Sequence, residues 1–359
     1  MKKIVEKNPE RVWYLEYLRI IATVAVIVLH VAAQNFYGVD VESFAWKVFN
    51  CANGLVRWSV PVFLMISGAL FLDNEKEITI SKLYKKYIWR LIVAFIFWSA
   101  IYALTDFWKG ATLRTTIKSF ITGPSHLWYI FMIIGLYIIT PMLRKITESE
   151  KITKYFLAVT FVMTVFLPRC ASLAKTFKIP HTTLLLECYN AINSDMQFHF
   201  TMGYVGYFVL GYYLSKKECS VLVRRLCCVV GAVGMIATVC LTDWYSIKIG
   251  KPNVYFYAHF AFCTVAATIG LFVFCKYYLS KFVPKGRTAV VISKAAKYSF
   301  GVYMVHMLIL NTLKDTFHIT TVSVHPVVGV IGLSVVTLVI SYIIVGIILL
   351  IPKINKYIV

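Results

Sequence analysis

The sequence predicts an all-α integral membrane protein that crosses the bilayer many times. Of its 359 residues, 59% are hydrophobic and only 15% are charged, and the mean hydropathy is +0.73. Soluble domains carry about 25% charged residues. Apolar runs of about 20 residues, the length that spans a bilayer as a helix, recur along the chain. We therefore expect one helical membrane domain over residues 1–359.

About ten runs are long and apolar enough to be membrane-spanning helices. They lie at roughly 13–35, 54–72, 85–105, 126–143, 154–168, 199–215, 226–243, 255–275, 298–314 and 326–351. The first run follows a basic start, contains Arg19 and lacks a small-residue cleavage site, which is typical of an anchor and not of a cleaved signal peptide.

The distribution of positive charge predicts the topology. The chain has 37 Lys and Arg residues against 16 Asp and Glu residues, a net charge of +21. Most of these cations fall at the helix ends and connections on the side of the amino terminus, which predicts that both termini are cytoplasmic. A charge of this size is also found in nucleic-acid-binding proteins, but the positional bias argues against a nucleic-acid partner.

The longest stretch between predicted spans covers 169–198, on the outer side. Its apolar residues predict a folded cap and not a linker. The nine cysteines form no C-x-x-C pair and no metal-binding pattern, so we predict no metal. Cys170 and Cys188 share the outer stretch; an oxidising compartment would permit a disulfide, which spacing alone does not decide.

Two polar residues stand out in the first predicted span. Arg19 and His30 are about three helical turns apart, so they lie on one stripe of the helix, roughly 16 Å apart along its axis. A charged side chain within a span usually faces a cavity or a partner. The alternative for Arg19 is snorkelling to the headgroups with Glu16 as its partner, and the alternative for His30 is contact with interfacial water.

Other spans carry further candidates. His306 lies about eight residues inside its span, where a histidine is either functional or held by an interhelical hydrogen bond. Arg57 lies within the second span, and His126, Trp128 and Tyr129 open the fourth. Tryptophan and tyrosine at such positions also form interfacial belts, and the spaced glycines of 203–214 are typical of helix packing.

Several of these stretches, taken in order, resemble the acyltransferase-3 family of membrane O-acyltransferases. They are the Arg19–His30 arrangement, "RWSVPVFLMISG", "KKYIWR", "HLWYI", "LYIITP", "GYFVLGYYL" and "SFGVYMVH". The resemblance covers nearly the whole chain and is strongest to stand-alone enzymes that O-acetylate bacterial surface polysaccharide. Two departures are Glu16, where the family has an aspartate, and Val93–Ala94, where many members have a proline after the basic pair.

The resemblance implies an enzyme of the bacterial inner membrane that transfers an acyl group, expected to be acetyl, from cytoplasmic acetyl-CoA to a hydroxyl of a surface or lipid-linked glycan. Its partners would be acyl-CoA, the glycan acceptor and membrane lipid. A transporter or flippase, which also places Arg and His in cavities, and a non-catalytic partner in cell-envelope glycan assembly are the alternatives. The absence of a visible internal repeat disfavours the transporter.

The physical chemistry of this reaction assigns roles to the candidates. CoA is polyanionic, so Lys86 and Arg90, four residues apart at the cytoplasmic end of a span, are expected to bind its phosphates, with Arg19 deeper; ordinary cytoplasmic anchoring is the alternative for the pair. His30 is expected to activate the acceptor hydroxyl or to carry the acyl group itself. Arg19, which would orient or polarise the donor, and His306 are the other catalytic candidates. The expected substrate-binding residues are Arg57, His126, Trp128 and Tyr129.

Overall fold

A computed structural model describes residues 12–177, 179, 182–196, 203–352 and 355–358. Over these residues the chain is helical and contains no β-strand. The α-helices are α1 (Trp13–Ala33), α2 (Phe44–Gly54), α3 (Ser59–Phe71), α4 (Ile80–Lys82), α5 (Trp89–Trp108), α6 (Leu113–Thr122), α7 (Trp128–Thr147), α8 (Glu150–Thr160), α9 (Leu167–Thr176), α10 (Thr182–Met196), α11 (Val205–Lys216), α12 (Val221–Ile249), α13 (Phe262–Tyr277), α14 (Gly286–Asp315), α15 (Pro326–Leu349) and α16 (Asn355–Ile358). Short π-helical turns (Leu83–Ile88 and Phe161–Phe166) and 3-10 turns (Ser125–Leu127, Tyr255–Tyr257 and Leu279–Lys281) join several of them.

Within the described ranges, eight helices or runs of consecutive helices are long and apolar enough to cross a membrane. They coincide with eight of the predicted spans and confirm an all-α polytopic membrane protein. The remaining predicted spans are 199–215, where α11 has only 12 residues, and 298–314, within α14, which carries charged residues toward both ends. The exact number of crossings and the side of the termini stay predictions.

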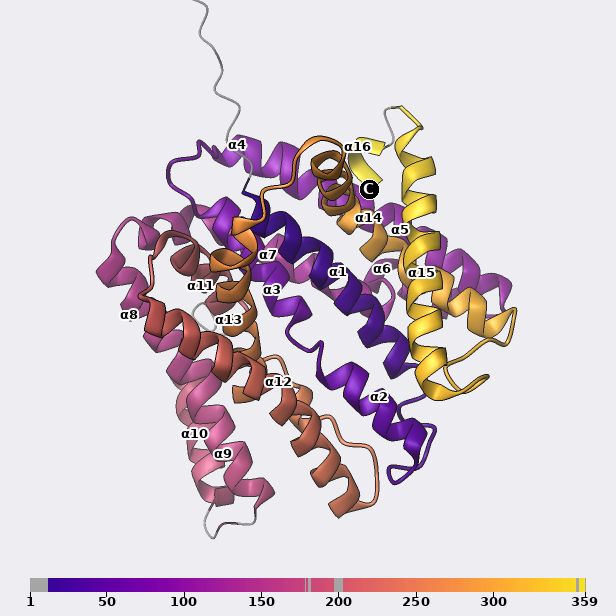
Figure 1. The fold of residues 1–359 in the computed structure, drawn as a ribbon, viewed down its shortest axis with the longest axis horizontal. Coiled ribbons are helices and arrows are strands. Elements are labelled where there is room, and N and C mark those ends of the chain that lie inside the picture. The colour runs from indigo at the N-terminus through magenta and orange to yellow at the C-terminus, as the bar shows by residue number, and fades with distance from the viewer. Residues whose placement is uncertain (1–11, 178, 180–181, 197–202, 353–354, 359) are drawn as a thin grey trace, which may run out of the picture.

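Helix α1 lies at the centre of the molecule (Figure 1) and packs against α2, α3, α13, α14 and α15. Its buried face combines Leu18 with the small residues Ala22, Ala25 and Ala32. Small side chains let neighbouring helices approach closely, which is the main source of packing between helices in lipid. The central position of α1 therefore brings one face of this helix into contact with several others at once.

The second predicted span is longer than expected and is broken. The continuous run Phe44–Phe71 consists of α2 and α3, which meet at 55–58. The predicted start at 54 was wrong because α2 contains Asn50 and Asn53, which reduce its apolar character. Asn50 is nevertheless buried, because its amide donates to the Val239 carbonyl (3.1 Å) and its side-chain oxygen accepts from Tyr257. The break brings the amino terminus of α3 into the interior.

Helices α3 and α11 touch backbone to backbone. A Cβ atom on Gly68 would overlap the carbonyl oxygen of Phe208, and one on Gly211 would overlap the carbonyl oxygen of Met65. Glycine is therefore required at both positions for this crossing. The contact fixes α3, which lies against α1 on its other side.

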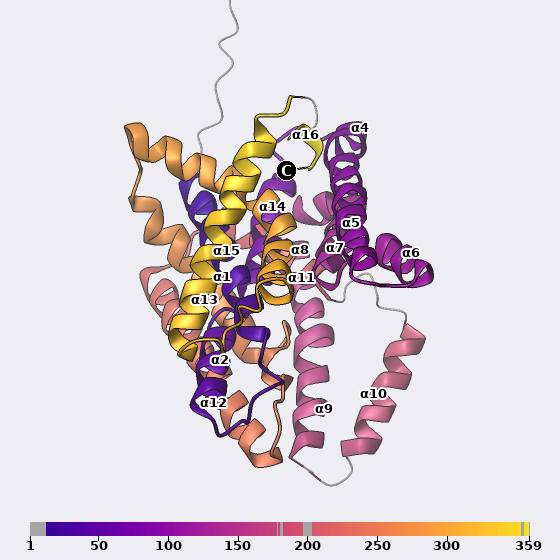
Figure 2. The same ribbon diagram turned by 90° about the vertical axis from the view of Figure 1, so that its right-hand side faces the viewer.

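The predicted cap over 169–198 is helical where it is described. Helices α9 and α10 project from the bundle as a hairpin (Figure 2). The Tyr189 hydroxyl donates to the Met163 carbonyl at 2.9 Å, and Phe177 stacks on Trp244 with ring centroids 6.0 Å apart. Cys170 and Cys188 are exposed, unpaired thiols in this structure.

Candidate functional site

A cavity of about 930 Å³ runs between α1, α3, α5, α7 and α14. Its ionisable lining consists of Arg19, Arg57, Lys76, Lys82, Arg90 and Lys297, of His30, His126 and His259, of Tyr87, Tyr129, Tyr137, Tyr298 and Tyr303, and of Glu77, the one acid among the described lining residues. The excess of cations over acids makes the cavity suited to anionic ligands.

The cavity has two chemically different ends. Arg57 precedes α3 and Lys76 follows it, and a helix of 13 residues is about 20 Å long. We call the end near the start of α1 the basic end; it contains Arg19, Lys76, Lys82, Arg90 and Lys297. We call the opposite end the aromatic end; it contains Arg57, Trp128 and His259. His30 lies roughly 16 Å beyond Arg19 along α1, toward the aromatic end.

His30 and His306 form a hydrogen-bonded pair. His30 Nδ1 lies 2.9 Å from the Val26 carbonyl oxygen and 3.1 Å from His306 Nε2. His306 Nδ1 lies 2.7 Å from the Tyr303 carbonyl oxygen. Because a carbonyl oxygen only accepts, the hydrogen-bond network assigns a proton to Nδ1 of both neutral rings. His306 Nε2 is then an acceptor, and His30 Nε2 carries an unprotonated lone pair.

The two histidines differ in their access to the cavity. His30 is half-buried and lines the cavity, and over the described residues no hydrogen bond holds its Nε2. His306 is fully buried and does not line the cavity. The lone pair of His30 is therefore available to a ligand, whereas His306 contacts the ring of His30 behind the cavity wall.

His126 completes a cluster of three imidazoles. Its ring centroid lies 5.4 Å from that of His306 and 6.4 Å from that of His30. Tyr303 donates a hydrogen bond to the His126 carbonyl, which holds the 3-10 turn in which His126 lies. His126 lines the cavity, and its Nε2 is buried without a protein partner.

The aromatic end provides a flat surface beside His30. The rings of Trp128 and His259 are stacked with centroids 5.9 Å apart and an interplanar angle of 22°. The Tyr204 hydroxyl is hydrogen-bonded to His259 Nδ1 at 2.7 Å, which fixes the imidazole. Tyr129 also lines the cavity and packs edge-on against Tyr303, at 5.7 Å between centroids.

At the basic end, Arg19 pairs with Glu16, as the snorkelling alternative expects, and it also lines the cavity. Its Nη1 lies 3.4 Å from Glu16 Oε1. Arg90 lines the same end, with its guanidinium 5.3 Å from the centroid of the Phe300 ring. Both cations thus line the path of an anionic ligand that enters from this end.

Lys86 is placed differently from Arg90. The segment that contains Lys86 is not the expected uninterrupted α-helix, because Leu83–Ile88 is a π-helical turn. Arg90 lines the cavity, whereas Lys86 is exposed and is not part of the lining.

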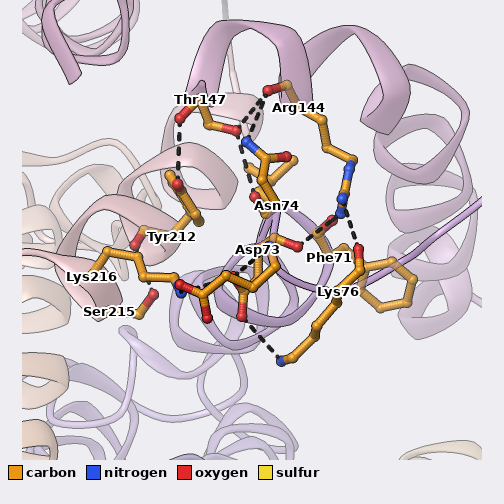
Figure 3. A network of polar contacts seen from close by, with 11 residues as sticks. Phe71, Asp73, Asn74, Lys76, Arg144, Thr147, Tyr212, Ser215 and Lys216 are labelled. Carbon is orange, nitrogen blue, oxygen red and sulfur yellow. Dashed lines mark hydrogen bonds and ion pairs between the residues drawn. The ribbon is translucent and has the colours of Figure 1, made fainter. Parts of the chain in front are cut away.

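A polar network holds the chain that forms the wall of the basic end (Figure 3). The Arg144 guanidinium, from α7, donates to the carbonyl oxygens of Phe71 (2.9 Å), Asp73 (3.0 Å) and Lys76 (2.8 Å). Lys216, from the end of α11, lies 2.8 Å from the Asp73 carboxylate. Arg144 therefore positions the segment that contributes Lys76 and Glu77 to the cavity without lining the cavity itself.

The Asp73 carboxylate in this network is ionised at neutral pH. Burial alone would raise its pKa, but the hydrogen bond from Lys216 and the positive charge of that side chain outweigh burial and hold the pKa below its ordinary value. The ion pair therefore persists at neutral pH and ties the segment after α3 to the end of α11.

Comparison with known proteins shows the family of the chain. The family model for an acyltransferase domain, that of acyltransferase family 3, matches residues 12–346, nearly the whole chain. The chain belongs to acyltransferase family 3. No curated protein and no solved structure matches it. Membership of the acyltransferase family supports a multi-pass membrane enzyme that transfers an acyl group to a hydroxyl acceptor.

Most of the residues predicted from the sequence line this acyltransferase's cavity. They are Arg19, His30, Arg57, Arg90, His126, Trp128 and Tyr129. His306 lies behind His30, and Lys86 lies outside the lining. The roles assigned to all of them stay predictions. Over the described residues, no three His, Cys, Asp or Glu side chains are grouped as metal ligands.

Sequence reasoning missed several residues of the site. His259 is a single histidine in an aromatic stretch and has no distinguishing spacing. Lys76, Lys82 and Lys297 resemble ordinary cytoplasmic anchors. Arg144 acts through backbone carbonyl groups, which leave no signal in the sequence.

Proposed function

We propose that this acyltransferase transfers an acetyl group from acetyl-CoA, bound at the basic end, to a glycan hydroxyl that enters from the aromatic end. The observation that carries the proposal is the position of the His30 lone pair in a single cavity between a cluster of cations and an aromatic surface. The positive-inside bias places the basic end on the cytoplasmic side, where acetyl-CoA is available.

The basic end matches the chemistry of the donor. The phosphate groups of CoA require cations, and Lys76, Lys82, Arg90 and Lys297 all line this end. Charge-assisted hydrogen bonds to phosphate are about twice as strong as neutral ones. Arg19 lies deeper along α1, so its guanidinium would contact the donor closer to the thioester than the others do.

His30 supplies the general base. Its Nε2 takes the proton of the acceptor hydroxyl as the hydroxyl oxygen attacks the thioester carbonyl carbon. The carbon–sulfur bond then breaks, and the imidazolium returns the proton to the CoA thiolate. His306 Nε2 accepts a hydrogen bond from the N–H at His30 Nδ1. This bond holds the reactive tautomer and stabilises the positive charge that His30 acquires.

The aromatic end suits the acceptor. Sugar rings present C–H faces that pack on aromatic side chains, and their hydroxyl groups need polar partners. The stacked Trp128 and His259 rings provide the aromatic surface, and the lone pair of His30 Nε2 provides a polar partner for one hydroxyl. The expected orientation brings one acceptor hydroxyl to His30 Nε2.

The test uses the purified full chain in detergent with acetyl-CoA labelled in the acetyl group and envelope glycan from the host. We expect label to appear in the glycan, with an increase in glycan mass of one acetyl group per modified sugar. Absence of label in every glycan fraction, together with movement of intact glycan across vesicles containing the protein, would instead support the transporter. Label that remains on the protein after a rapid quench at neutral pH without acceptor, and that is lost in His30→Ala, would indicate an acyl-histidine intermediate.

A further inference from the structure

We infer that the acceptor carries an anionic group, a carboxylate or a phosphate, and that Arg57 binds it at the aromatic end. The inference rests on the proposed function only in assigning the anion to the acceptor. The site combines a cation in the cavity wall, the start of α3 and the aromatic surface at the same end of the cavity.

Arg57 is a cation without an acidic partner. Its guanidinium lies 4.0 Å from the centroid of the Tyr257 ring, and its Nε is buried without a hydrogen bond. Over the described residues no carboxylate lies within ion-pair distance of it, and the one acid of the lining, Glu77, lies beyond the opposite end of α3. An interior arginine in a membrane protein normally faces a counter-charge, and an anionic ligand in this cavity would provide one.

The start of α3 adds a backbone donor near Arg57. Arg57 lies two residues before Ser59, where α3 begins, and Val60 in the first turn of α3 lines the cavity. The N–H groups of Ser59 and Val62 already donate to backbone carbonyl groups, and Pro61 has no N–H. Over the described residues this leaves the Val60 N–H as the donor that a ligand can use, and an N–H at the start of a helix favours an anion.

The position of this site suggests that its ligand belongs to the acceptor and not to the donor. Arg57 and the cations around Lys76 lie at opposite ends of α3, about 20 Å apart. CoA phosphates bound at the basic end would therefore leave Arg57 unoccupied. The stacked Trp128 and His259 rings line the same end of the cavity and match a sugar that bears the anion or adjoins it.

Two matched ligand pairs test the inference by equilibrium binding, without acetyl-CoA, so the result does not depend on turnover. One pair is methyl glucuronide and methyl glucoside, which differ by a carboxylate; the other is a short polyprenyl phosphate and its polyprenol. We expect the anionic member of at least one pair to bind the wild-type chain at least about tenfold more tightly. The pair that responds distinguishes a uronic acid from a lipid phosphate.

Substitutions connect this preference to Arg57. Arg57→Gln should remove the preference, Arg57→Lys should retain part of it, and Arg114→Gln, an exposed arginine of α6, should leave it unchanged. Thermal unfolding of each variant checks that the fold is intact. Equal binding of both members of each pair by the wild type, or a preference that survives in Arg57→Gln, would overturn the inference.

A transfer assay separates anion binding from a role at the reaction centre. Arg57→Gln should raise KM for the anionic acceptor about tenfold or more, so that the preference in kcat/KM for the anionic over the neutral acceptor falls by a similar factor. A fall in kcat of the same size for both acceptors would mean that Arg57 stabilises the transition state, and it would contradict the inference.

Discussion

At the scale of single residues, the histidine pair divides two tasks between His30 and His306. His30 presents a lone pair to the cavity. His306, which is fully buried, accepts a hydrogen bond from Nδ1–H on the other side of the His30 ring. The Val26 carbonyl shares that proton, so His30 keeps one acceptor even without His306. The sequence indicated both histidines but not their contact, because they come from helices far apart in the chain.

His306→Ala should therefore lower kcat about tenfold while KM for acetyl-CoA stays unchanged, a smaller loss than removal of a general base, which costs about 10²- to 10⁴-fold. His306→Gln, whose side-chain oxygen can accept from His30, should recover part of the activity. Steady-state kinetics with labelled acetyl-CoA give both constants. An effect confined to KM, or no rescue by Gln, would argue that His306 only fills space.

The two basic residues predicted to bind the donor should behave differently. Arg90→Gln should raise KM for acetyl-CoA about tenfold or more with little change in kcat, because contacts to remote phosphates supply uniform binding. Lys86→Gln is the matched control, since Lys86 does not line the cavity. Steady-state kinetics with labelled acetyl-CoA measure KM and kcat for both variants. Equal effects of the two substitutions would show that the exposed lysine also reaches the donor.

At the scale of elements, the segment between α3 and α4 carries part of the proposed donor site and has no regular structure before Ile80. Its conformation depends on local hydrogen bonds to Asp73 and also on Arg144 of α7 and Lys216 of α11, which lie far away in the sequence. For this reason a sequence reading places Lys76 in an ordinary loop. The π turn at Leu83–Ile88 was likewise not predictable, because nothing in "LYKKYI" distinguishes a π turn from an α turn.

Arg144→Gln should loosen this segment and raise KM for acetyl-CoA more than it lowers kcat, because it removes three hydrogen bonds that position Lys76. Lys145→Gln is the neighbouring control: Lys145 is exposed and pairs only with Glu148, at 2.8 Å. The charge change is the same in both variants. If both variants raise KM equally, the effect comes from the lost surface charge and not from the hydrogen bonds of Arg144 to the segment after α3.

The crossing of α3 and α11 should tolerate no side chain. Gly68→Ala and Gly211→Ala should each lower the unfolding temperature in detergent, because the added Cβ overlaps a backbone carbonyl and overpacking costs about 1–3 kcal/mol or more. Gly332→Ala in α15 is the control, since nothing lies within 4 Å of its Cβ position. Unchanged unfolding temperatures for the first two variants would show that the helices can separate without loss.

At the scale of the whole molecule, the apolar runs and the motif order were sufficient to predict the helical membrane fold and the family. They were not sufficient to predict the break in the second span or the placement of His259, because both depend on tertiary contacts. Asn50 illustrates the reason: its polarity argues against a span, and hydrogen bonds from another part of the chain satisfy it.

In the proposed mechanism the donor binds at one end of the cavity, the acceptor binds at the other end, and His30 lies between them. The most direct test of this claim is the rate of label transfer from acetyl-CoA to glycan by His30→Ala, compared with His325→Ala, an exposed histidine outside the cavity. We expect the first variant to insert and fold normally and to lose at least about 10²-fold in kcat, and the second to match the wild type. Near-normal transfer by a folded His30→Ala variant would contradict the account.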